Sequence, residues 1–208
     1  MKDNILNKAC DKFLKDGYSN VNMDDISREL GISKKTLYDH FESKKGLFQS
    51  CANKIVTKHV EQAKTLQERM TKDGDFHFLD EMINLWDLIA EHITVFKPRF
   101  IEDIKRYSPE SWEICGENDE NKRKFFNKIF DLGKQKGFIR KNINRNVFFM
   151  MYVNSIHSVI KLEVLSELSL NSKQALHMIF EILFQGSLTE HGNQEFNKVI
   201  NNNRSVSK

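Results

Sequence analysis

Apolar residues recur at intervals of three and four along most of the chain, which is the pattern of amphipathic helices. Ile26 and Leu30 belong to one short stripe, and Leu37 and Phe41 form a second stripe four residues apart. Gly31 lies between the stripes, where a residue that tolerates a left-handed conformation ends a helix and turns the chain. The spacing therefore predicts two short helices joined by a tight turn.

Polar residues mark where both helices begin. Asn22 precedes the first helix and Ser33 precedes the second, and both residue types are favourable N-caps. Asp24 and Asp25 fall in the first turn of the first helix, where acidic side chains suit the positive end of the helix dipole. The caps and the apolar stripes predict the same boundaries.

Longer stripes predict further helices before and after this pair. The expected spans are residues 3–16, 44–70, 76–96, 120–136, 144–165 and 172–188, with short helices that start at Pro98 and Pro109. The predicted fold class is all-α. A domain boundary falls inside the long helix, which gives an N-terminal domain over 1–46, a larger helical domain over 47–192, and a frayed polar tail over 193–208.

A helix, a three-residue turn with glycine and a second helix form the outline of a helix-turn-helix, whose second helix enters the major groove of DNA. At about 100° per residue, Lys35, Thr36 and Asp39 point most nearly away from the buried side, so we expect them to contact base edges. Phosphate contacts are expected from the flanking side chains and from the start of the next helix. The predicted DNA-binding residues are Ser33, Lys34, Lys35, Thr36, Tyr38, Asp39, His40 and Lys44.

The composition is that of a globular protein, with 39% apolar and 29% charged residues and a net charge of +3. This charge by itself does not indicate a nucleic-acid partner, but four lysines surround the second short helix. The three cysteines, Cys10, Cys51 and Cys115, form no C-x-x-C pair, so we expect neither a disulfide framework nor a metal site. With no signal peptide and no long apolar run, we expect a cytoplasmic protein without a membrane span or a cofactor.

The segment LGISKKTLYDHFESKKGLF, preceded by a helix that ends in Asp-Gly-Tyr, resembles the N-terminal domain of the TetR family of bacterial transcriptional repressors. The residues that match the family pattern are Gly17, Tyr18, Ile26, Gly31, Ile32, Ser33, Leu37, Tyr38, Phe41 and Lys44. Leu30, Lys35 and Gly46 depart from the pattern, and Lys35 bears on any base contacts carried over from the family. The motif covers about the first quarter of the chain.

The resemblance implies a homodimer that pairs through the last two long helices and binds a palindromic operator. It also implies a helical effector-binding domain. Aromatic residues between positions 86 and 149 are candidates for lining the pocket of this domain. The predicted ligand-binding residues are Trp86, Phe100, Ile104, Tyr107, Trp112, Phe126, Phe130 and Asn154. The alternative for each aromatic residue is an ordinary place in a core, and Asn154 could instead lie at an interface.

Enzymes are the main rival class. The sequence has no G-x-S-x-G, no H-E-x-x-H, no phosphate-binding loop and no dinucleotide fingerprint, so we expect no catalysis. A further alternative is a DNA-bound helical protein that regulates through protein contacts and has no effector. We expect a ligand-responsive transcriptional regulator, with a repressor favoured over an activator, that a small apolar or aromatic effector releases from DNA.

Overall fold

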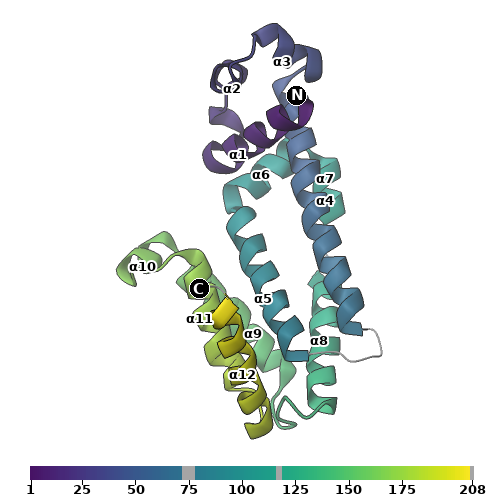
Figure 1. The fold of residues 1–208 in the computed structure, drawn as a ribbon, viewed down its shortest axis with the longest axis vertical. Coiled ribbons are helices and arrows are strands. Elements are labelled where there is room, and N and C mark those ends of the chain that lie inside the picture. Colours follow the sequence, from purple (N-terminus) through teal and green to yellow (C-terminus); the bar gives the residue numbers. More distant parts are fainter. Residues whose placement is uncertain (72–77, 116–118, 207–208) are drawn as a thin grey trace. The chain divides into compact units, whose positions relative to one another are not determined.

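The computed structural model describes residues 1–71, 78–115 and 119–206, and its regular elements are all α-helices (Figure 1). This confirms the predicted all-α class. The helices are α1 (Lys2–Asn20), α2 (Met23–Leu30), α3 (Lys34–His40), α4 (Lys44–Thr71), α5 (Phe78–Val95), α6 (Pro98–Tyr107), α7 (Pro109–Cys115), α8 (Asp119–Gln135), α9 (Arg145–Val159), α10 (Leu162–Glu167), α11 (Ser172–Gln185) and α12 (Glu190–Val206).

Two helical predictions were wrong. The span predicted as one helix over 144–165 is divided at Ile160 and Lys161 into α9 and α10. The predicted frayed tail from Asn193 onward lies in α12, because Phe196 is 1% exposed and anchors that helix in a core. The start of the helix predicted over 76–96 lies outside the described residues.

The chain forms two compact units, one of Met1–Gln62 with Val95–Glu117 and one of Ala63–Thr94 with Asn118–Lys208. These units differ from the predicted ranges 1–46 and 47–192. The difference arises because α6 packs against α1, so α6 and α7 belong with the helix-turn-helix. The long helix α4 contributes residues to both units.

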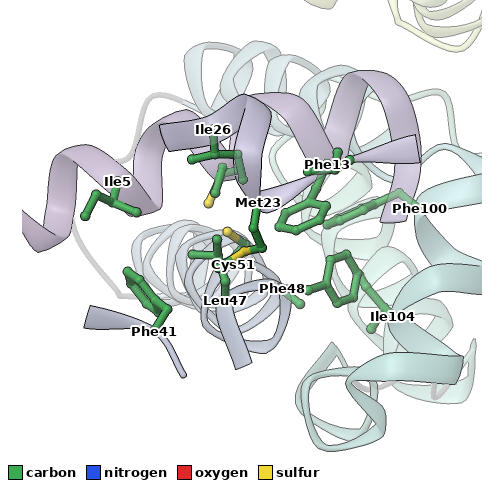
Figure 2. Close-up of a cluster of buried hydrophobic side chains, with 14 of the residues drawn as sticks. Ile5, Phe13, Met23, Ile26, Phe41, Leu47, Phe48, Cys51, Phe100 and Ile104 are labelled. Atoms are coloured by element: carbon green, nitrogen blue, oxygen red, sulfur yellow. The ribbon is translucent and has the colours of Figure 1, made fainter. Parts of the chain in front are cut away.

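The first unit is built around a core of side chains from α1, α2, α3, α4 and α6 (Figure 2). Phe13 and Phe48 are fully buried and meet edge to face, with their ring centroids 5.0 Å apart. Phe100 of α6 packs on Phe48 at 6.1 Å. Leu37 of α3 is also fully buried, so the short third helix is attached to the same core. Burial of a large apolar side chain stabilises a fold by about 1.5–3 kcal/mol, which explains why a seven-residue helix holds its place here.

The second unit has its own core, in which aromatic rings predominate. Trp86 of α5 stacks on Phe180 of α11 with ring centroids 3.9 Å apart, and Tyr152 of α9 meets Trp86 edge to face at 4.4 Å. Phe196 of α12 packs edge to face on Phe184 at 5.4 Å. In the described part of the chain, no helix is both long and apolar enough to cross a bilayer.

Candidate nucleic-acid interface

The helix α3 is buried on one side and open on the other. Leu37 is fully buried and Phe41, directly after the helix, is 6% exposed. On the opposite side Lys35, Tyr38 and Asp39 are exposed, and Tyr38 is exposed to 46% despite its aromatic ring. Lys35 and Asp39 are thus exposed as predicted, whereas Thr36, which was also expected to point outward, is partly buried.

All the residues predicted to contact DNA lie on α3, at its cap, or at the start of α4, and all belong to the first unit. The exposed ones are Ser33, Lys34, Lys35, Tyr38 and Asp39, and the partly buried ones are Thr36, His40 and Lys44. The structure brings this set together on one short stretch. Their contacts with DNA remain predictions.

The turn between α2 and α3 has the geometry that its sequence predicts. Gly31 has φ 64° and ψ 29°, the left-handed conformation that glycine adopts without a steric penalty. Its N–H donates to the carbonyl groups of Ser27 and Arg28, and the Ile32 N–H donates to the Ser27 carbonyl at 3.0 Å. These bonds satisfy the last carbonyls of α2 and fix the angle at which α3 leaves the turn.

Ser33 and Thr36 form the N-cap of α3. The Thr36 N–H donates to Ser33 Oγ at 3.0 Å, and the two hydroxyl oxygens are 2.8 Å apart. The Thr36 hydroxyl is thus already hydrogen-bonded within the protein. The methyl group of Thr36 can still contact a thymine methyl group, because such a contact needs no free hydroxyl.

Lys34 is held by an acidic residue of the preceding helix. Its Nζ lies 2.5 Å from Oδ2 of Asp24, and both side chains are substantially exposed. An exposed pair of this kind contributes little to stability, typically about 0.2–1 kcal/mol. Lys34 can therefore exchange Asp24 for a phosphate at small cost. The pairing of Asp24 with Lys34 was not predicted. The sequence indicated only that the Asp24 carboxylate suits the positive end of the helix dipole.

Lys44 lies at the start of α4 and contacts the end of α1. Its Nζ donates to the Ser19 carbonyl at 3.4 Å and sits 4.5 Å from the centroid of the Tyr18 ring. Burial lowers the pKa of Lys44, and the nearby Asp103 carboxylate partly opposes this shift. Lys44 therefore joins two helices in addition to any contact that it makes with phosphate.

The same end of α1 is fastened to α6. Tyr18 donates its backbone N–H to Oδ2 of Asp103 at 2.7 Å, and its ring stacks on Tyr107 with centroids 3.7 Å apart. This contact follows a backbone break at Gly17, which has φ 73°. A side chain at Gly17 would collide with the guanidinium group of Arg99, so α6 approaches the backbone closely there. We did not predict Arg99 or Asp103, and no local sequence signal marks them.

The predicted ligand-binding residues are divided between the two units. Phe100 and Ile104 are buried in the core of the first unit, and Tyr107 and Trp112 pack against it. Trp112 also lies under the ammonium group of Lys105, 4.3 Å from its ring centroid. These four side chains pack in or against the core of the helix-turn-helix unit. This is the alternative to a ligand pocket that was stated above.

The other predicted ligand-binding residues lie in the second unit. Phe126 and Phe130 pack on Phe148 at 5.9 and 5.3 Å, whereas Asn154 is exposed on α9. Trp86 is 5% exposed, and its indole Nε1 has no hydrogen-bond acceptor among the described residues. A buried donor without an acceptor is costly, so Trp86 is the member of this set with an unmet polar requirement.

Comparison with known proteins agrees with this geometry. A family model described as "Bacterial regulatory proteins, tetR family" matches residues 5–51, which contain α2, α3 and most of α1. Residues 5–51 form a TetR-family DNA-binding domain. Because the relatives are transcriptional regulators and not enzymes, the prediction of a non-enzymatic regulator is confirmed.

Two relatives of this chain illustrate how far the likeness extends. The uncharacterized HTH-type transcriptional regulator YvaF of Bacillus subtilis (strain 168) is 23% identical over 164 residues, 79% of this chain and 84% of YvaF. The biofilm operon icaADBC HTH-type negative transcriptional regulator IcaR of Staphylococcus aureus is 41% identical over 49 residues, which is 24% of this chain and only 26% of IcaR. The higher identity is thus confined to a short segment.

Solved structures show that the likeness of fold is wider than that of sequence. A TetR-family transcriptional regulator from Marinobacter aquaeolei VT8 has a TM-score of 0.57 at 16% identity and covers 96% of each chain. A TetR transcriptional regulator from Chloroflexus aurantiacus J-10-fl has a TM-score of 0.54 at 19% identity and covers 88% of this chain and 92% of its own. The fold of the TetR family therefore extends over both units.

Proposed function

We propose that this protein is a homodimeric, ligand-responsive repressor that binds a palindromic operator through α3. The observation that carries the proposal is the open face of α3, where Lys35, Tyr38 and Asp39 are exposed while Leu37 is fully buried. A helix held from behind and exposed in front is the arrangement that enters a major groove. The match of residues 5–51 to the family supports the same role.

Lys35, Thr36 and Asp39 are the proposed base-reading residues. Lysine can donate to guanine O6 and N7, the threonine methyl group can contact a thymine methyl group, and aspartate can accept from cytosine N4. We propose that Lys34, Tyr38, His40 and Lys44 position the helix on phosphates, with Ser33 as its cap. Phosphate contacts fix register and orientation, and they carry no sequence information directly.

An exposed apolar surface on α9 and α11 supports the proposed homodimer. The two helices pack on each other (Figure 1), yet large apolar side chains on both of them remain open. The exposed apolar residues are Val147, Met150 and Met151 of α9 and Met178 and Ile182 of α11, with exposures from 50% to 71%. Asn154 lies one turn beyond Met150 and Met151, so we assign it to this surface. Exposed apolar side chains on two neighbouring helices are typical of a protein interface.

Repression and release by an effector complete the proposal. Repression follows the description of IcaR as a negative regulator, to which this chain is 41% identical over 49 residues. We propose an apolar or aromatic effector that binds in the second unit, where Trp86, Phe126 and Phe130 lie. Because α4 contributes residues to both units, a change in the second unit can alter the DNA-binding geometry through this helix. A coupling of about 1–3 kcal/mol is typical and is enough to release an operator.

The decisive experiment is operator selection from a randomised duplex pool, followed by affinity measurements on the selected sequence. We expect a palindrome with half-sites about 34–36 Å apart, one DNA turn, bound by a dimer. Lys35→Ala and Asp39→Ala should change the selected sequence, and Asp80→Ala in α5 is a control that should leave it unchanged. Recovery of no preferred sequence by the wild-type protein would refute the proposal.

A further inference from the structure

The core of the helix-turn-helix unit contains two neighbouring free thiols. Cys10 of α1 is 7% exposed, and Cys51 of α4 is fully buried beside Leu47 (Figure 2). Cys51 Sγ donates a weak hydrogen bond to the Leu6 carbonyl at 3.6 Å. Leu6 is one helical turn before Cys10, and a helical side chain leans back over the preceding turn. Both sulfur atoms are therefore directed to the same turn of α1, and each thiol shifts the pKa of the other.

The two thiols differ in ways that suit different chemical roles. The neighbouring Cys51 thiol holds the pKa of Cys10 below its ordinary value, despite burial, and the Lys54 ammonium acts in the same direction. The neighbouring Cys10 thiol and full burial raise the pKa of Cys51. Cys10 is also the thiol nearer to solvent, which suits it as the attacking sulfur in a redox pair.

We propose that Cys10 and Cys51 form an oxidation site, at which a peroxide converts the thiol pair to an intramolecular disulfide that weakens operator binding. The first part stands on the packing of α1 against α4. The effect on DNA rests on the function proposed above.

The chemistry balances with peroxide as the oxidant. The Cys10 thiolate attacks one peroxide oxygen, so an S–O bond forms, the O–O bond breaks, and the leaving hydroxide takes up a proton to give water. The Cys51 sulfur then attacks the sulfenic acid at Cys10, so the S–S bond forms and the S–O bond breaks. The departing hydroxide leaves as a second water with the Cys51 proton. The sulfur pair has then supplied the two electrons that reduce the peroxide.

Disulfide formation would alter the unit because a disulfide is much shorter than a contact between thiols. An S–S bond is about 2.05 Å long and restricts the relative positions of the two Cβ atoms, so a disulfide constrains how α1 and α4 pack at this level. Both helices are tightly packed here, since Ala9 and Ala52, next to the two cysteines, are fully buried. Close-packed cores transmit such strain to their surroundings. The start of α4 adjoins α3, so we expect the orientation of α3 to change.

Mass spectrometry of the oxidised full-length protein tests the chemistry without reference to DNA. Hydrogen peroxide should lower the intact mass by two hydrogen atoms, and dithiothreitol should restore it. Trypsin cleaves after Lys8, Lys12, Lys45 and Lys54, so the expected product is a linked pair of peptides, 9–12 and 46–54. Cys10→Ala and Cys51→Ala should abolish that product, and Cys115→Ala is the matched control that should retain it. Oxygen addition without the linked peptides would overturn the oxidation site.

Fluorescence anisotropy on the selected operator tests the consequence. After oxidation, wild-type protein and Cys115→Ala should bind the operator at least about fivefold more weakly than in the reduced form. A fivefold change is the lower end of typical couplings. Cys10→Ala should bind equally well before and after peroxide treatment, and this variant suffices even where Cys51→Ala fails to fold. A linked pair of peptides with unchanged operator affinity would overturn the regulatory part alone. Failure of the reduced protein to select any operator would instead refute the function proposed above.

Discussion

Removal of the Asp103 carboxylate is the sharpest test of how α6 supports the DNA-binding unit. Asp103 accepts the Tyr18 N–H at 2.7 Å in a partly buried setting, and it lies near the Lys44 ammonium. A hydrogen bond to a charged group contributes about 1.5–3 kcal/mol, and an orphaned buried donor costs a similar amount. We therefore expect Asp103→Ala to lose about 1.5–3 kcal/mol of stability. For a chain of this length each kcal/mol lowers the melting temperature by about 2–4 °C.

Three variants measured together make this result specific. Asp103→Asn keeps an oxygen acceptor for the Tyr18 N–H, so it should recover most of the loss. Glu102→Ala removes the same charge at an exposed neighbouring position and should stay within about 0.5 kcal/mol of wild type. Thermal melts should be run at one protein concentration, because the stability of a dimer depends on it. Hydrogen exchange at the Tyr18 amide should accelerate in Asp103→Ala.

The reasoning would be refuted if Asp103→Ala and Glu102→Ala had the same melting temperature. It would also be refuted if Asp103→Asn lowered the melting temperature as much as Asp103→Ala. The first outcome would mean that α1 does not depend on this acceptor. The second would mean that the negative charge, and not the hydrogen bond, is what α1 needs.

Four further predictions follow from other parts of the chain. Lys44→Ala should weaken binding to all duplexes alike and make the salt dependence shallower by about one unit, and a sequence-selective loss in anisotropy titrations would contradict a phosphate contact. Thr36→Ser keeps the capping hydroxyl and removes the methyl group, so repeated operator selection should show altered preference at one base position, whereas a uniform loss would argue against base reading. Lys12 and Lys8 lower the pKa of Glu29 to about 2, so the stabilisation from this carboxylate is present above about pH 4.5 and is lost as pH falls toward 2. Glu29→Gln should flatten the melting temperature across that window, and an unchanged profile would show that the ion pairs are not maintained in solution. Ile182→Lys should convert a dimer to monomers in sedimentation experiments, and a stable dimer would place the interface elsewhere.

The helix-turn-helix could be predicted closely because its signals are local. Asn22 and Ser33 accept backbone N–H groups as N-caps, and Gly31 adopts the left-handed conformation, as expected from residues within four positions of each other. The burial of Leu37 follows from the same short spacing. In this part of the chain local propensity and tertiary packing favour the same structure.

The association of α6 with α1 could not be predicted, because it depends on residues far apart in the chain. Tyr18 and Asp103 are 85 residues apart and neither forms part of a recognisable motif with the other. For the same reason Tyr107 was placed in a ligand pocket, although its ring stacks on Tyr18. An aromatic residue on a short helix shows that something is buried there, and it does not show against what.

The errors near the C-terminus have a different cause. The apolar spacing continues across Ile160 through Val164 and Leu165, so periodicity alone gives no sign of the break between α9 and α10. In α12 the signal was present, since Phe196, Val199 and Ile200 have helical spacing and contact the second core. The many asparagines around them obscured it.

The packing of Phe100 and Tyr107 on Phe48 limits how this regulator can be taken apart. A fragment that stops after Gln62 would expose the aromatic side of α4 to solvent. We therefore expect it to aggregate and not to function as an isolated DNA-binding domain. Chimaeras that join this DNA-binding unit to another effector-binding domain must also carry residues 95–115, which are separated in the sequence from residues 1–62.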